Sequence, residues 1–237
     1  MSASPAPSGS NYVISFPANP SLPVKGSAAR FPVRRVFCIG RNYAEHAREM
    51  GHDPDREAPF YFMKPAWALA IESDTVDYPP MTEDLHHEIE LVVALGKGGS
   101  AVAESNALDL VYGYAVGIDL TRRDRQGEAK KAGRPWEVGK AFAQSAPIGA
   151  VVPATEIGHP SSGRIWLEVD GALRQDGDLS QLTWSVPELI AQVSRYDRLE
   201  PGDLIFTGTP AGVGPVTRGQ QLRGGVAGIG EIDVTLK

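Results

Sequence analysis

Cysteine is almost absent from the chain, because Cys38 is the only one among 237 residues. A single cysteine excludes an intrachain disulfide and favours a reducing compartment, so we predict a cytoplasmic protein. Cys38 lies in the apolar run VFCIG, where we expect it to serve as a small buried hydrophobic residue.

Long apolar runs and blocks of positive charge are also missing. No run approaches the roughly 18 apolar residues of a membrane helix, and the start MSASPAPSGS has neither the basic nor the apolar region of an export signal. The formal net charge is -6, with no dominant basic block. We therefore predict a small-molecule partner and binding to neither membranes nor nucleic acid.

The sequence does contain enough apolar residues for a sizeable core. Its 42% hydrophobic content suits one globular domain at 11–237, after a flexible tail at 1–10. Its 26 glycines and 19 prolines separate short Val, Ile and Leu runs, which indicates a mixed, β-rich α+β fold with few short helices. Strands are predicted at 11–16, 33–39, 59–63, 86–95, 111–119, 146–152, 164–170, 203–207 and 229–236, and helices at 42–50, 105–110, 121–132 and 186–197.

The run HHEIELVV carries two carboxylates, Glu88 and Glu90, inside an otherwise apolar strand pattern. Residues two apart on a strand share a face, so the two carboxylates lie close together. Alternating acids usually mark a solvated face, but the continuation LVVALG suggests a strand covered on both faces. Buried like charges require a cation, a shared proton or solvent.

A third acid, Asp119, ends the strand pattern GYAVGID just before the polar string TRRDRQ. It is placed to complete a three-carboxylate site with Glu88 and Glu90. Three hard oxygen donors without a thiolate favour Mg²⁺ or Mn²⁺ over zinc, with Ca²⁺ as a substitute in a crystal.

Further along the chain, several side chains are candidates for acid–base chemistry or ligand binding. His46 and Glu49 are three apart on a predicted helix, where the carboxylate can make the imidazole more basic; the alternative is a solvated surface pair. Lys64 and Lys140 follow apolar segments and could bind an oxyanion, although most lysines are exposed bystanders. The remaining candidates are Arg123 and Gln126 directly after Asp119, and Thr207 or Thr209 in the Gly-rich turn TGTPAGVG, which could equally be a turn without a ligand.

Six motifs in this order resemble the fumarylacetoacetate hydrolase family: IGRNYAEHAREM, YFMKP, HHEIELVV, GYAVGIDLTRRDRQ, GKAF and TGTPAGVGPV. The resemblance covers about residue 33 to the C-terminus. It implies a mixed β-sandwich and β-roll fold, usually dimeric, with a divalent metal ion at the mouth of the sheets.

Residue by residue, the resemblance implies metal binding by Glu88, Glu90 and Asp119, and water activation by His46 with Glu49. It implies that the side chains holding substrate or intermediate are Lys64, Arg123, Gln126, Lys140 and Thr209, with Lys140 placed to stabilise an oxyanion. The string GRPWEVGKAF is most similar to the small acylpyruvate branch, especially the fumarylpyruvate hydrolases of aromatic breakdown through gentisate.

The expected reaction is metal-dependent hydrolysis of a 3-acylpyruvate, giving fumarate and pyruvate if the acyl group is fumaryl. The far carboxylate of fumarylpyruvate needs a cation, for which Arg41, Arg48 and Arg56 are candidates, and residues 51–58 are predicted to form a lid. The alternatives are an oxaloacetate decarboxylase, an isomerase or decarboxylase of homoprotocatechuate breakdown, and a dicarboxylate-binding protein without turnover.

Overall fold

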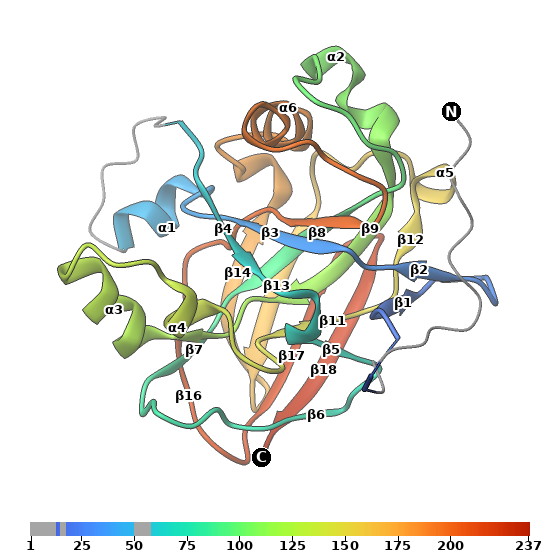
Figure 1. Cartoon of the computed structure of the whole chain (residues 1–237). Coiled ribbons are helices and arrows are strands. Elements are labelled where there is room, and N and C mark those ends of the chain that lie inside the picture. The colour runs from blue at the N-terminus through green and yellow to red at the C-terminus, as the bar shows by residue number, and fades with distance from the viewer. Residues whose placement is uncertain (1–12, 15–17, 50–57) are drawn as a thin grey trace.

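The computed structural model describes residues 13–14, 18–49 and 58–237, apart from the side chains of His46 and Ala47. The fold is mixed and rich in strands, with 40% strand and 21% helix, which confirms the predicted β-rich α+β class. Two curled sheets pack face to face, with the helices around their edges (Figure 1). The tail at 1–10, most of the strand predicted at 11–16 and all of the lid predicted at 51–58 except Ala58 lie outside the described residues.

The larger sheet has eight strands among the described residues, and the metal-site motifs lie at its centre. Its long neighbouring strands β8 and β9 are antiparallel, with Glu90 opposite Gly117. In spatial order the strands are β4 (Tyr61–Lys64), β3 (Arg35–Ile39), β15 (Asp203–Phe206), β8 (Ile89–Leu95), β9 (Val111–Ile118), β11 (Ala146–Ile148) and β5 (Leu69–Ile71), while β12 (Val152–Pro153) also pairs with β9.

The second sheet packs on one face of the first. In the described residues it has five strands: β14 (Ala172–Asp178), β13 (Arg164–Val169), β17 (Gln221–Val226), β18 (Gly230–Leu236) and β6 (Thr75–Val76). Ile89 and Leu91 of β8 point into the core between the sheets, whereas Val92 and Ala94 enter a second core on the opposite face. All of β8 is buried, as the unbroken apolar run LVVALG predicts.

The predicted strand at 86–95 is interrupted at Glu88. The preceding residues form β7 (Leu85–His87), which pairs in a small separate sheet with β10 (Thr121–Arg122) and β16 (Gly214–Val216). The chain leaves β9 for β10 at the same level, so Asp119 lies beside Glu88, and the Asp119 N–H donates to the Glu88 carbonyl oxygen at 2.8 Å. Two acids are therefore held where the chain changes sheets.

Two short helices, α3 (Arg123–Lys131) and α4 (Glu137–Lys140), follow this crossing and pack against each other beside β10. A Cβ at Gly139 would lie 2.9 Å from the Gln126 backbone nitrogen, so glycine allows this close packing. The other helical elements are α1 (Ala44–Glu49), α2 (Glu104–Ala107), α5 (Ala154–Ile157), α6 (Val186–Tyr196) and the 3₁₀ turns Ala66–Ala68, Leu108–Leu110 and Leu179–Gln181.

Several of these elements agree with the sequence predictions. Helix α6 begins after Ser185, which forms a capping box with Glu188, close to the predicted start of a helix at 186. Asp170 and Gly171, both with positive φ, form the hairpin turn that follows the strand predicted at 164–170. The short strands β1 (Ser21–Pro23) and β2 (Arg30–Pro32) were not predicted, nor was β17. β17 contains Gly224, and glycine weakens the sequence pattern of a strand. Glycine is required at this position because a Cβ would lie 2.7 Å from the Trp166 carbonyl oxygen. No helix in the described part of the chain is long and apolar enough to cross a membrane.

Candidate metal and substrate site

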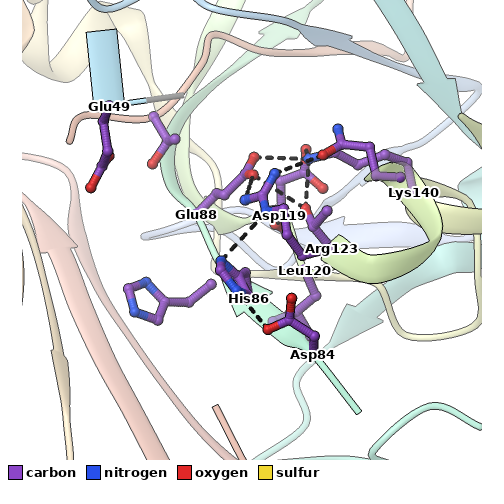
Figure 2. Close-up of polar contacts among 12 residues, drawn as sticks. Glu49, Asp84, His86, Glu88, Asp119, Leu120, Arg123 and Lys140 are labelled. Carbon is purple, nitrogen blue, oxygen red and sulfur yellow. Dashed lines mark hydrogen bonds and ion pairs between the residues drawn. The ribbon is translucent and has the colours of Figure 1, made fainter. Parts of the chain in front are cut away.

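Three carboxylates meet at the junction of the sheets. Oxygen atoms of Glu88, Glu90 and Asp119 all lie within 4.8 Å of one another, and the three residues are at most 5% exposed. Figure 2 shows Glu88 and Asp119 facing the side chains of Arg123 and Lys140 across this cluster. The carboxylates predicted from two separate motifs are thus brought together.

Lys140, at the end of α4, contacts two of the three acids. Its Nζ lies 2.8 Å from both Glu88 Oε2 and Asp119 Oδ2, and it also donates to Thr121 Oγ1 at 2.6 Å. These contacts use all three N–H groups of the ammonium. Burial alone would lower the pKa of Lys140, but the charges of Asp119 and Glu88 raise it above its ordinary value, so the side chain stays cationic.

Lys64, at the end of β4, contacts Asp119 but does not line the pocket. Its three N–H groups go to the carbonyl oxygens of Leu120 and Lys140 and to Ser145 Oγ. Asp119 Oδ1 is 2.9 Å from Nζ but receives no hydrogen bond, and within the described residues this buried oxygen has no hydrogen-bond donor at all. An open lone pair therefore remains at the centre of the cluster.

Glu90 is the acid with the least compensation. Its Oε2 accepts a hydrogen bond from the Gly208 N–H at 2.7 Å. Burial, followed by the charges of Asp119 and Glu88, raises the pKa of its carboxyl group well above the ordinary value. A divalent cation fits these residues, because it would compensate Glu90 and take up the lone pair of Asp119, and three carboxylate oxygens suit Mg²⁺ or Mn²⁺.

Arg123 and Gln126 come from the first turn of α3 and border the same cluster. The guanidinium of Arg123 donates to Glu88 Oε1 at 2.5 Å and to Gln126 Oε1 at 2.8 Å. Behind it, His86 Nδ1 lies 3.4 Å from Arg123 Nε, and Asp84 Oδ1 lies 2.9 Å from His86 Nε2 (Figure 2). Arg123 is thereby oriented from two sides.

Thr209 borders the opposite side of the pocket, but its hydroxyl group is already occupied. It donates to the Ile89 carbonyl oxygen at 2.8 Å and accepts from Gln175 Nε2 at 2.7 Å. Gln175 is fully buried, and its Oε1 also accepts from the Ile89 N–H and contacts His87 Nδ1. Thr209 is thus a fixed part of the wall, and Thr207 likewise donates to the Leu91 carbonyl oxygen.

A pocket opens in front of Glu88 and Glu90. Its aromatic wall is formed by Phe60, Phe62 and Trp136. The ring centre of Trp136 lies 5.5 Å from that of Phe60 in an edge-to-face arrangement and 5.8 Å from that of Phe62 in a tilted one. The rest of the lining is Ile39, Gly40, Arg41, Glu88, Glu90, Arg123, Gln126, Lys130, Lys140 and Thr209. The pocket therefore combines an aromatic wall with a few polar and charged groups, as small-molecule sites commonly do.

The pair predicted to activate water is only partly described. His46 lies on α1, and its side chain is outside the described residues. The Glu49 carboxylate accepts hydrogen bonds from the Gly212 N–H at 3.1 and 3.2 Å, and it lies to one side of the network around Glu88 (Figure 2). Their joint role stays a prediction.

Several residues at the site were not singled out from the sequence, among them Thr121, Lys130 and Trp136. Thr121 is fully buried and bridges Lys140 and the carboxylates, and Lys130 and Trp136 line the outer pocket. Lys130 had a detectable signal, because it follows Arg123 by seven residues and so lies on the same helix face. Of the cations proposed for a far carboxylate, Arg41 lines the pocket, Arg48 is exposed on α1, and Arg56 is outside the described residues.

Buried carboxylates next to cationic side chains at a pocket are typical of an enzyme active site. The match to the family model described as fumarylacetoacetate (FAA) hydrolase C-terminal covers residues 35–237. The chain belongs to the fumarylacetoacetate hydrolase family, as the motifs predict.

Known proteins similar to this chain differ in the reactions for which they are named. A crystal structure of fumarylpyruvate hydrolase from Pseudomonas aeruginosa, in complex with Mn²⁺ and pyruvate, is 51% identical with a TM-score of 0.94, covering 95% of this chain and 99% of that one. The mitochondrial oxaloacetate tautomerase FAHD1 of Bos taurus is 45% identical over 196 residues, 83% of this chain and 88% of that protein. A 5-carboxymethyl-2-hydroxymuconate delta-isomerase from Mycobacterium smegmatis is 31% identical, with a TM-score of 0.77, covering 88% of this chain and 78% of that one.

Proposed function

We propose that this protein is a divalent-metal-dependent hydrolase that cleaves the carbon–carbon bond of a 3-acylpyruvate, with fumarylpyruvate as the substrate and fumarate and pyruvate as products. The observation that carries the proposal is the buried cluster of Glu88, Glu90 and Asp119, in which Glu88 and Glu90 line a pocket that also contains four cationic side chains. The likeness to a fumarylpyruvate hydrolase solved with Mn²⁺ and pyruvate supports the same assignment.

In this proposal Glu88, Glu90 and Asp119 hold Mg²⁺ or Mn²⁺, which when bound supplies Lewis-acid stabilisation of negative charge on oxygen. Arg123 and Gln126 lie beside Glu88 and are placed to bind the pyruvyl carboxylate of the substrate. Lys140 provides a fixed ammonium group at the cluster, where it can stabilise an oxyanion. Lys64, whose ammonium group lies behind Asp119, holds that carboxylate in place.

We assign the removal of the proton from water to His46, assisted by Glu49. The resulting hydroxide adds to the carbonyl carbon of the acyl group, and the tetrahedral alkoxide collapses with cleavage of the bond to C3 of the pyruvyl group. The electron pair of that bond passes to the pyruvate enolate, which takes up a proton at C3. The acyl group leaves as a carboxylic acid, so one water is consumed in each turnover.

Tautomerisation of oxaloacetate on the same site is the second candidate. It is favoured by the 45% identity to a protein named oxaloacetate tautomerase. Keto–enol exchange moves a proton between carbon and oxygen and requires no hydroxide, so it makes no use of a water-activating pair. Decarboxylase and carboxymethyl-hydroxymuconate isomerase reactions belong to the same group of alternatives.

The first experiment follows the loss of the ultraviolet absorbance of enolic fumarylpyruvate with Mg²⁺, with Mn²⁺ and with a chelator, next to acetylpyruvate and oxaloacetate. We expect rapid loss of fumarylpyruvate only when a metal ion is present, with fumarate and pyruvate formed in equal amounts. Tautomerisation of oxaloacetate without hydrolysis of either acylpyruvate would replace the hydrolase proposal with the second candidate.

The variant His46→Ala tests the assigned base. Hydrolysis should fall by about 100-fold or more, which is the usual contribution of general-base catalysis, whereas metal-dependent decarboxylation of oxaloacetate should persist. Glu45→Ala, one residue earlier on an exposed part of α1, is the matched control and should keep both rates. An equal loss of both activities in His46→Ala would remove the assignment of His46 to water activation.

Two further features belong to this proposal. We infer a homodimer, which light scattering of the purified protein would test. We also infer a cytoplasmic, reducing compartment, which is supported by the presence of a single cysteine, Cys38. Burial raises the pKa of the Cys38 thiol well above the ordinary value and keeps the thiol unreactive. Fractionation of the native host would test the compartment.

A further inference from the structure

The pocket contains more positive than negative charge. Its described lining has four cationic side chains, Arg41, Arg123, Lys130 and Lys140, but only two carboxylates, Glu88 and Glu90. Arg123 and Lys140 are both bonded to Glu88. A metal ion bound at the carboxylates would add to this positive charge, so the pocket favours a ligand with more than one negative group.

Helix α3 sets the spacing of the cations along the pocket. Arg123 and Lys130 are seven residues apart, which is nearly two turns, so they lie on one face with about 10.5 Å between them along the axis. Gln126 lies between them on the same face, and all three line the pocket. Arg123 contacts the carboxylate cluster, and Lys130 therefore marks the far end of the site.

Lys130 has no ion pair or hydrogen bond among the described residues. Its half-buried ammonium group lies 5.0 Å from the ring centre of Trp136, which favours a cation but supplies no acceptor. Burial, followed by the charges of Arg123, Arg41 and Lys140, lowers the pKa of Lys130 to about 8, with Glu88 acting weakly in the opposite direction. An incoming carboxylate would relieve this unfavourable charge.

We propose that Lys130 binds the distal carboxylate of the substrate and selects seven-carbon 2-oxo diacids over monoacids. With carbon–carbon bonds of about 1.5 Å, an extended seven-carbon diacid places its carboxyl carbons about 7.5 Å apart, whereas a four-carbon diacid reaches only about half as far. Since the ammonium can extend toward the cluster, the longer ligand spans from Arg123 to Lys130 and oxaloacetate does not. The identity of this ligand class rests on the proposed function, but its binding does not require turnover.

A matched pair of ligands isolates the distal charge. 2-Oxoheptanedioate and 2-oxoheptanoate have the same number of carbons and the same 2-oxo acid end, and they differ in one terminal carboxylate. Calorimetric titration with Mn²⁺ at pH 7 measures both dissociation constants for the wild type and for Lys130→Met, Lys130→Arg and Lys131→Met. Lys131 is the exposed neighbour of Lys130 and serves as the control.

We expect the wild type to bind the diacid about tenfold or more tightly than the monoacid, which is typical of a charge-assisted hydrogen bond in a partly buried site. Lys130→Met should remove this preference without changing monoacid binding, Lys130→Arg should retain most of it, and Lys131→Met should retain all of it. A preference that survives in Lys130→Met, or one that is absent from the wild type, would overturn the proposal.

The same variants separate this inference from the proposed reaction. If fumarylpyruvate is hydrolysed equally well by the wild type and Lys130→Met, and diacid binding is also unchanged, the reaction stands and the role of Lys130 is wrong. If no acylpyruvate is hydrolysed but the diacid preference depends on Lys130, the binding site stands and the reaction must be reassigned.

Discussion

Replacing Glu90 by glutamine should have opposite effects on stability with and without a metal ion. Glu90 is buried beside Glu88 and Asp119, and its raised pKa shows that the folded protein disfavours its charge. For a carboxyl group whose pKa is raised on folding, stability is greatest below the unfolded pKa and is lost as the pH rises toward the folded pKa. At pH 8 without metal, Glu90→Gln should therefore unfold at a higher temperature than the wild type.

The magnitude follows from the spacing of the acids. Two unit charges at most 4.8 Å apart repel by about 3.5 kcal/mol or more at an effective dielectric constant of about 20. Because Lys140 partly neutralises Glu88 and Asp119, the net gain for Glu90→Gln should be about 1–3 kcal/mol. For a chain of this size that corresponds to a rise in Tm of about 2–12 °C. The amide oxygen of glutamine can still accept the hydrogen bond from the Gly208 N–H.

Binding of Mn²⁺ or Mg²⁺ reverses the order. At a free ion concentration of about 100 Kd, the wild type should gain about 2.7 kcal/mol, whereas Glu90→Gln lacks one of the three carboxylates and should gain much less. Differential scanning fluorimetry at pH 8, with chelator and across a series of metal concentrations, measures both effects. Glu104→Gln, an exposed acid on α2, should behave like the wild type. A variant that is destabilised without metal, or that keeps the full metal-induced rise in Tm, would refute the reasoning.

Three further predictions concern other parts of the site. If Lys130 binds the distal carboxylate, the preference for 2-oxoheptanedioate over 2-oxoheptanoate should decline as the pH rises above about 8, because free Lys130 then loses its charge. The preference should persist at high pH in Lys130→Arg, and a pH-independent preference in the wild type contradicts the prediction. Gln175→Leu should lower the free energy of unfolding by about 2–4 kcal/mol, because the Ile89 N–H and His87 Nδ1 lose their partner, whereas Gln192→Leu on α6 should change it little in urea denaturation. Gly208→Ala should weaken metal binding measured by calorimetry, because Gly208 has φ +96° and a Cβ would lie 2.8 Å from Asn42 Cβ; Gly228→Ala, with φ +77° and open space, should leave metal affinity unchanged.

The acidic cluster was predictable because local sequence patterns carried the necessary information. Glu88 and Glu90 are close in sequence, and Asp119 ends an apolar strand pattern. The structure differs from the prediction in one respect, because Glu88 does not lie on the same strand as Glu90. The chain changes sheets at Glu88, and the hydrogen bond between the Asp119 N–H and the Glu88 carbonyl oxygen fixes the third acid there. Strand alternation predicted the right neighbours without predicting this break.

The contacts of the cations were not predictable, because they depend on packing between distant segments. Lys64 and Lys140 both follow apolar runs in sequence, and the sequence offers no means of distinguishing them. In the fold, α4 presents Lys140 to Glu88 and to the pocket, while β4 directs Lys64 toward three acceptors behind Asp119. Similar local surroundings therefore produce two different positions relative to the acids.

The distribution of charge along α3 connects the metal end of the pocket to its substrate specificity. Arg123 is committed to Glu88 at one end of the helix face, while Lys130 two turns later has no acidic partner among the described residues. A side chain needed only to stabilise the fold gains nothing from a half-buried, unpaired charge whose pKa is lowered. The destabilised ammonium of Lys130 is better explained as preparation for an anion, and its distance from Arg123 limits which anions can bridge the two. In this proposal, one face of α3 selects substrates by their length and charge, while the reaction takes place at the carboxylates near the start of the helix.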